Sequence, residues 1–117
     1  LLDSELKSAL ETVPSGAETS VSGGKFRAIA SFRDSKSNLC REFEKDRGTD
    51  LSFVGVACHT NGAWSVNTVI ASAQTGDGYA PASSLDAIDA FMASIGASEP
   101  LPPEEEKAVL SAIAGSQ

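Results

Sequence analysis

Four short segments in which apolar and polar residues alternate follow one another along the middle of the chain, and they restrict the fold more than any other feature. They cover residues 25–33, 38–44, 51–59 and 63–71. A period of two residues is typical of β-strands that bury one face. Asn61-Gly62 separates the last two segments, and this dipeptide favours a two-residue hairpin turn because both central residues need a positive φ. The segments therefore predict an antiparallel meander.

Helical patterns flank the meander on both sides. Residues 1–13 place apolar side chains on one helical stripe, and Pro14 ends it. Residues 84–95 carry a second apolar stripe that Gly96 terminates, and residues 103–114 begin with a proline and three glutamates, which suit the first turn of a helix. We expect one helix before the meander and two after it.

These elements together predict an α+β fold in a single domain that spans residues 1–117. The core is an antiparallel meander over residues 25–71, with four strands or with a fifth if residues 19–21 add an edge strand. The helices are expected to cover the sheet, because its exposed face or its edges need cover.

The turns also set the register between strands. Centring them on Ser35-Lys36 and on Asn61-Gly62 places Phe32 opposite Leu39 and Gly55 opposite Thr68. One face of the sheet then collects most of the large apolar side chains, and Arg41 falls on the same face. We expect Arg41 near the sheet margin or paired with a carboxylate, because a lone buried charge is costly. The predicted core face consists of Phe26, Ala28, Phe32, Leu39, Phe43, Phe53, Ala57, Trp64, Val66 and Ile70.

The two cysteines lie on the two middle strands. If Phe43 faces Gly55, then Cys40 faces Cys58 directly. Directly opposed residues of an antiparallel pair lie about 4.5–5.5 Å apart at Cα, within the range that a disulfide bridges. We therefore predict a structural disulfide between Cys40 and Cys58, which fits an oxidising compartment.

Other interpretations of the cysteines stay open. Two buried free thiols would suit a reducing compartment. Zinc takes four ligands in closely spaced pairs, whereas His59 is adjacent to Cys58 and points to the opposite face of its strand. The Cys-x-x-Cys motif of redox catalysts is absent from the sequence. We expect no metal and no cofactor.

Candidates for catalysis are sparse. His59 is the only histidine, and no serine or cysteine stands in a nucleophile-elbow context. We expect His59 to be a solvent-facing or rim residue beside the hairpin turn. Glu42 with Glu44, or Asp86 with Asp89, could form an acid and base pair, but charged faces are usually only solvated. The sequence indicates that the protein is not an enzyme.

Charge excludes some partners. Sixteen acidic against nine basic residues give a net charge of −7, and the basic residues are scattered. Nucleic acids and anionic membranes require a clustered positive field, so we expect neither as a partner. No run reaches the roughly 18 apolar residues of a membrane span. The sequence begins at Leu1 without an initiator methionine, and we expect that an upstream segment, such as a signal peptide or membrane anchor, precedes it.

A combination of residues in the middle of the chain carries a family resemblance. Cys-Arg-Glu-Phe at 40–43 is followed by Gly-x-Ala-Cys at 55–58, then by Gly62 and by Trp-x-Val at 64–66. This pattern resembles a small extracytoplasmic β-domain of proteobacterial envelope proteins. The domain is found in rickettsial-type surface-antigen lipoproteins and in the periplasmic part of membrane-anchored anti-sigma factors of α-proteobacteria.

Three further segments resemble the anti-sigma group and extend the likeness over about residues 25–106. They are Ser31-Phe32, GYAPAS at 78–83 and PLPPEEE at 100–106. The chain departs from the family at His59, where an arginine usually follows the second cysteine, so a shared charged contact at that position is not carried over.

The resemblance implies a non-catalytic periplasmic sensor or regulatory domain of an anti-sigma factor. Membrane attachment would come from an upstream segment. An envelope protein or a protease would be the partner, and a sigma factor would bind only a cytoplasmic part outside this chain. The alternative is a surface-antigen-like outer-membrane lipoprotein module with a structural or interaction role.

A third possibility is a small-ligand site on the sheet face around Val54, Val56 and Val69. An apolar pocket lined by these residues would support it, and a helix packed across them would remove it.

Overall fold

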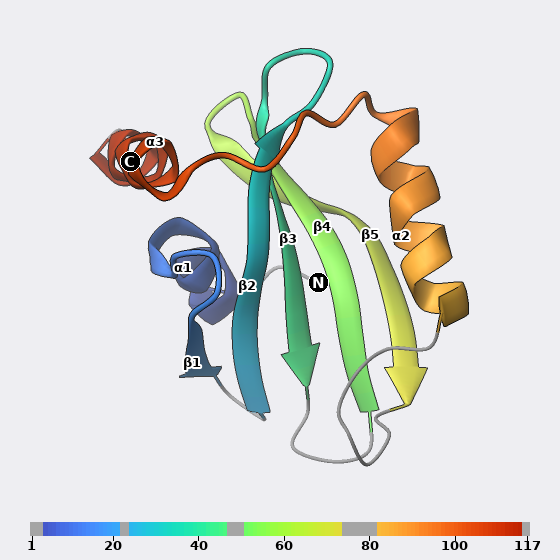
Figure 1. The fold of residues 1–117 in the computed structure, drawn as a ribbon. Coiled ribbons are helices and arrows are strands. Elements are labelled where there is room, and N and C mark those ends of the chain that lie inside the picture. Colours follow the sequence, from blue (N-terminus) through green and yellow to red (C-terminus); the bar gives the residue numbers. More distant parts are fainter. Residues whose placement is uncertain (1–3, 22–23, 47–50, 74–81, 116–117) are drawn as a thin grey trace.

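The computed structural model describes residues 4–21, 24–46, 51–73 and 82–115. Five strands form one antiparallel sheet in which each strand pairs with its neighbours in sequence (Figure 1). A helix precedes the sheet and two helices follow it, which confirms the predicted α+β fold. The elements are α1 (Ser4–Thr12), β1 (Glu18–Val21), β2 (Gly24–Arg33), β3 (Leu39–Asp46), β4 (Leu51–Thr60), β5 (Ala63–Ala73), α2 (Ala82–Ser94) and α3 (Pro103–Gly115).

Local sequence explains how several elements end. Asn61 and Gly62 have φ values of 53° and 82°, as a two-residue hairpin between β4 and β5 requires. Gly96, with φ 68°, ends α2, and the N–H of Ala97 donates to the carbonyl of Met92 at 3.0 Å. α3 begins at Pro103 and has three glutamates in its first turn, where they complement the positive end of the helix dipole.

The sheet is the middle layer of three. Figure 1 shows α1 and α3 beside the β1–β2 end of the sheet and α2 beside β5, and the two buried clusters place these helices on opposite faces. The larger core lies between the sheet and the α1–α3 side, and its fully buried strand residues include Phe26, Phe43 and Trp64. The smaller core lies on the α2 side. Its buried strand residues are Phe32, Cys40, Val56 and Cys58, and the half-buried residues packed against them are Phe91, Met92, Ile95 and Ala97. β3 and β4 are consequently buried on both faces.

Two predicted core residues lie on the opposite face from the one expected. A β-bulge between Ala28 and Ala30 shifts the register, so Phe32 pairs with Cys40 instead of Leu39 and lies on the α2 face. An extra residue inverts every side chain that follows it in the strand.

A second bulge shifts β5 against β4. The register changes between Val56 and Ala57, so Gly55 pairs with Val69 instead of Thr68. Ile70 pairs with Val54 and therefore joins the disulfide face rather than the predicted core face. The β3–β4 ladder, in contrast, runs without a shift from Leu39 to Asp46, and it pairs Phe43 with Gly55 as predicted.

Candidate functional site

The two cysteines form a disulfide at the centre of the sheet. Cys40 in β3 and Cys58 in β4 pair directly, with their sulfur atoms bonded at 2.04 Å and their Cα atoms 3.9 Å apart. Both residues are buried, with exposed fractions of 0% and 1%. The structure therefore has the predicted bridge, and the ladder is narrower at this rung than the expected 4.5–5.5 Å.

α2 covers the disulfide on its apolar side. Phe91, Met92 and Ile95 of this helix pack against the cluster that contains the two cysteines. The turn after β2 meets the end of the same helix, where the N–H of Ser35 donates to the carbonyl of Ile95 at 2.9 Å. The helix and the turn together exclude solvent from the sulfur atoms.

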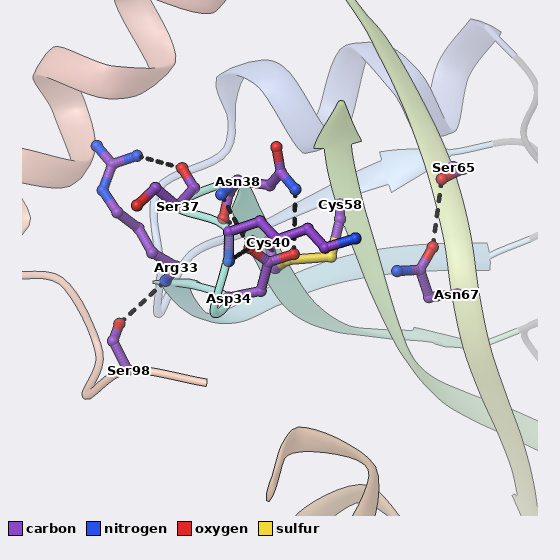
Figure 2. The surroundings of a disulfide bond; sticks show 10 residues. Arg33, Asp34, Ser37, Asn38, Cys40, Cys58, Ser65, Asn67 and Ser98 are labelled. Atoms are coloured by element: carbon purple, nitrogen blue, oxygen red, sulfur yellow. Dashed lines mark hydrogen bonds between the residues drawn. A yellow bond between two sulfur atoms is a disulfide. The ribbon is translucent and has the colours of Figure 1, made fainter. Parts of the chain in front are cut away.

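A carboxylate lies beside the disulfide in that turn (Figure 2). Asp34 Oδ1 accepts hydrogen bonds from the N–H groups of Lys36 and Asn38, both at 2.9 Å, and Oδ2 accepts one from Asn38 Nδ2 at 3.2 Å. Burial is the largest single effect and raises the pKa of Asp34, but these hydrogen bonds and the charge of Lys36 together outweigh it and lower the pKa below its ordinary value. Asp34 is therefore ionised at neutral pH.

The same three residues have the donor types of a metal site. The nearest ligand atoms of Asp34, Cys40 and Cys58 lie within 4.8 Å of one another. Zinc binds thiolates, however, and the two sulfur atoms are bonded to each other. The oxidised pair therefore leaves only the carboxylate as a ligand at this place.

His59 does not join this group, because it pairs with Trp64 on the other face of the sheet. Its ring meets the indole edge-on at a centroid distance of 5.2 Å, and Trp64 Nε1 donates to Glu11 Oε2 at 3.2 Å. His59 Nε2 is buried without a hydrogen-bond partner among the described residues. His59 is half-buried beside the hairpin turn, which fits the rim position among the two that were expected.

A buried ion pair is the most extensive polar arrangement that the described residues form. Arg41, with an exposed fraction of 0%, donates from Nη2 to Glu106 Oε2 at 3.3 Å, from Nε to Ser31 Oγ at 2.8 Å and from Nη1 to the Leu10 carbonyl at 2.8 Å. This guanidinium therefore also caps the C-terminal end of α1. The expectation that Arg41 pairs with a carboxylate is confirmed.

Glu106 receives the remaining hydrogen bonds of this cluster. Its Oε1 accepts from the N–H of Ser15 at 2.9 Å, and its Oε2 accepts from the hydroxyl groups of Ser15 and Ser31. Burial raises the pKa of Glu106, but the bonds from the two serines and the charge of Arg41 outweigh it and lower the pKa below its ordinary value. Burial also lowers the pKa of Arg41, against the attraction of Glu106. An arginine stays protonated in proteins, so both groups are charged at neutral pH.

The role of Glu106 was not identified from the sequence, although a signal exists. Glu106, Leu110 and Ile113 follow one another at spacings of four and three residues, and all three are buried. A carboxylate on the apolar stripe of a helix needs a buried cation, and Arg41 is the cation that the predicted core face contains.

A cavity of about 640 Å³ lies between α1 and α3, beside this ion pair. Its walls include Pro14, Leu101, Pro103 and Leu110, and Glu106 reaches it. Both charged groups already have partners inside the protein. The cavity therefore offers an apolar recess with no free charged group from the ion pair.

The structure brings together two acids that the sequence assigned to different pairs. Burial raises the pKa of Glu42 above its ordinary value, the charge of Asp89 raises it further, and Arg27 opposes both. Glu44 instead forms an ion pair with Arg27, at 3.0 Å from Nη2 to Oε1. The side chain of Asp86 lies outside the described part of the chain.

The structure excludes the small-ligand site on the sheet face that the sequence analysis left as a third possibility. Val56 has an exposed fraction of 0% and lies in the cluster that α2 covers, and Val54 is also buried. Val69 lies on the opposite face from these valines because of the bulge in β5.

Comparisons with known proteins add no neighbour: no family model, no curated protein and no solved structure matches the chain. Among the described residues, no helix is both long and apolar enough to span a membrane.

Proposed function

We propose that this chain is a non-catalytic, periplasm-facing module of a membrane-anchored anti-sigma factor. The observation that carries the proposal is the buried Cys40–Cys58 disulfide at the centre of the sheet. Such bridges persist in oxidising compartments and are rare in reducing ones. A locked central sheet would resist the proteolysis that releases a sigma factor.

The residues of the family-like motif support the proposal through their packing. Cys40, Arg41, Phe43, Ala57 and Cys58 are all buried in or beside the two central strands. The motif is thus explained as the set of residues that builds this sheet.

One glycine and one tryptophan of the motif, Gly55 and Trp64, fit the same explanation. A Cβ on Gly55 would lie 2.8 Å from Phe43 Cζ, so only glycine fits opposite that ring without a shift. Trp64 closes the larger core beside the hairpin. A chain that shares the motif is therefore expected to share the fold, and regulation would depend on the surface that surrounds it.

Localisation gives the first test. The gene product, from its own start up to Gln117, would be fused to alkaline phosphatase, which is active only outside the cytoplasm, or to β-galactosidase, which is active only inside it. The proposal expects phosphatase activity and no galactosidase activity. The reverse pattern would contradict an extracytoplasmic module.

Membrane fractionation and a transcription reporter separate the anti-sigma factor from the lipoprotein alternative. An anti-sigma factor would fractionate with the inner membrane, and its deletion would raise expression from promoters of one alternative sigma factor. A protein found in the outer membrane with a covalently attached acyl chain would instead establish the surface-antigen-like lipoprotein. The Cys40→Ser/Cys58→Ser variant, compared with the exposed Ser20→Ala control, would raise the reporter signal if the bridge delays proteolysis.

A further inference from the structure

At one end of the sheet, the outer edge of the long strand β2 is covered by the short edge strand β1 and by two further segments. β1 pairs with the first residues of β2, from Gly24 to Arg27. The next residue, Ala28, accepts a hydrogen bond from the N–H of Gly16 at 2.8 Å and donates one to the carbonyl of Ala17 at 3.1 Å. The segment before β1 therefore extends the cover along this edge.

The segment between α2 and α3 closes the rest of this edge. The N–H of Ser98 donates to the carbonyl of Arg33, and the N–H of Leu101 donates to the carbonyl of Ser31, both at 2.8 Å. Proteins cover exposed strand edges because unpaired backbone groups recruit other strands. Backbone hydrogen bonds from these segments therefore cover the outer edge of β2 at both of its ends and near its middle.

The opposite edge is formed by β5, which pairs with β4 alone in the sheet. Within the described ranges, no backbone hydrogen bond outside the β4–β5 ladder involves β5. This strand has 11 residues, AWSVNTVIASA, without a charged residue or a proline. Lysine and proline are common devices that prevent edge pairing, and β5 has neither. The bulge lies near its start and leaves a regular stretch from Thr68 onward.

The register shows which backbone groups point outward. The Cys40–Cys58 pair, with its Cα atoms 3.9 Å apart, is of the close type whose backbone groups point away from each other. Alternation along β4 then turns the backbone groups of Val56 toward β5 and those of Gly55 toward β3. Val69 pairs with Gly55, so its N–H and C=O point away from the sheet. Its side chain is large and hydrophobic, and it is exposed at 46%.

The features around β5 fit a second copy of this chain. Antiparallel pairing of β5 with itself brings no charge opposite a like charge, although the chain as a whole has a net charge of −7. Antiparallel pairing of two identical strands creates a two-fold axis perpendicular to the joined sheet. This axis places the α2 helices of the two copies on the same face of that sheet. These helices must be able to approach each other.

α2 presents small side chains toward that approach. The charge of Asp89 in α2 raises the pKa of Glu42 in β3, so the two carboxyl groups lie near each other. The side of α2 that carries Asp89 therefore faces the middle of the sheet. The exposed Ala87 and Ser94 lie on the other flank of the helix, toward β5. Small side chains on this flank leave room for a second α2.

We propose that β5 pairs antiparallel with β5 of a second copy, so that two sheets join into one continuous sheet across a two-fold axis. Each copy supplies the outward backbone groups around Val69 to the other. The interface is isologous, and it closes after two copies. The β2 edges, which are already covered, take no part.

Sedimentation equilibrium of the oxidised chain tests this proposal. The expected mass is twice the 12.0 kDa of one chain, with dissociation on dilution. Val69→Lys places a charge of the same sign from each copy at the interface, and it is expected to weaken dimerisation by about tenfold or more. Ser20→Lys makes the same change of charge at an exposed position of β1, at the opposite end of the sheet, and is expected to leave the dissociation constant unchanged.

Hydrogen exchange provides a second, independent measurement. The amide of Val69 is expected to exchange more slowly as the protein concentration rises, and the amide of Ser20 is expected to exchange at a constant rate. Ala87→Arg is expected to weaken the dimer while leaving the unfolding midpoint of the monomer unchanged. A chain that stays monomeric at high micromolar concentration overturns the proposal and leaves the β5 edge to an extended segment of another protein. A dimer that Val69→Lys does not weaken overturns it as well.

Discussion

At the scale of single residues, the Arg41–Glu106 pair ties four parts of the chain together. The guanidinium in β3 contacts Ser31 in β2, the end of α1 and Glu106 in α3. The carboxylate also binds Ser15 in the loop after α1. Because each charge satisfies the other, removing one of them leaves a buried charge without its counterpart.

Glu106→Gln is therefore expected to lower the free energy of unfolding by about 3–5 kcal/mol, whereas Arg41→Met combined with Glu106→Leu is expected to recover much of the loss. Urea unfolding of the two variants and of the exposed control Glu105→Gln measures these differences. A double variant no more stable than Glu106→Gln would contradict the account.

The same pair gives a dependence on pH whose sign follows from the lowered pKa of Glu106. A carboxyl group whose pKa is lower in the folded state stabilises the fold above its unfolded pKa. This contribution is lost as the pH falls from about 4.5, the ordinary value, through the folded pKa. The loss of stability between pH 5 and acid conditions is expected to be less steep in Glu106→Gln than in the wild type. Equal slopes in urea unfolding would count against this role.

At the scale of secondary-structure elements, α2 and the turn at residues 34–38 act as a cover for the disulfide. Apolar side chains of α2 exclude water, and the ionised Asp34 repels an approaching thiolate. Thiol–disulfide exchange requires a thiolate to reach a sulfur atom, so both features should slow reduction.

Asp34→Asn is expected to speed reduction by the anionic thiol glutathione more than reduction by the cationic thiol cysteamine. Phe91→Ala is expected to speed both, because it opens the apolar side of the cover. Rates of thiol release under native conditions measure these effects, and Asp46→Asn serves as a carboxylate control at the far end of β3. Equal acceleration of the two reagents by Asp34→Asn would show that charge has no part in the protection.

Strand pairing was predictable from the sequence where the ladder is regular. Between β3 and β4 alternation continues without interruption, so placing Phe43 opposite Gly55 was sufficient to pair Cys40 with Cys58. Phe32 and Ile70 were assigned to the wrong face because the bulges in β2 and β5 each insert one residue. In β2 the alternation around the bulge is filled with alanine and isoleucine on both faces, which gives no sign of the shift.

At the scale of the whole molecule, one disulfide connects the two strands that are buried on both faces. The two cysteines are 18 positions apart. A bridge across a loop of this length stabilises the folded state by about 3 kcal/mol, because it lowers the conformational entropy of the unfolded chain. Small domains have net stabilities of about 5–15 kcal/mol, so this is a large share.

Reduction, or the Cys40→Ala/Cys58→Ala variant, is accordingly expected to lower the free energy of unfolding by about 3 kcal/mol and to increase cleavage by a nonspecific protease. Urea unfolding and limited proteolysis of the oxidised and reduced chains measure this. The double variant treated with the same reductant has no disulfide to reduce, so it controls for other effects of the reductant. Identical midpoints would contradict a stabilising bridge.

The position of Glu106 in the last helix has a consequence for the order in which the chain can mature. During synthesis or transport from the N-terminal end, Arg41 emerges 65 residues before its acidic counterpart. Before α3 has emerged, packing of the core would bury the charge of Arg41 without its counterpart Glu106. The core is therefore expected to close only after α3 has emerged, so the fold is completed late.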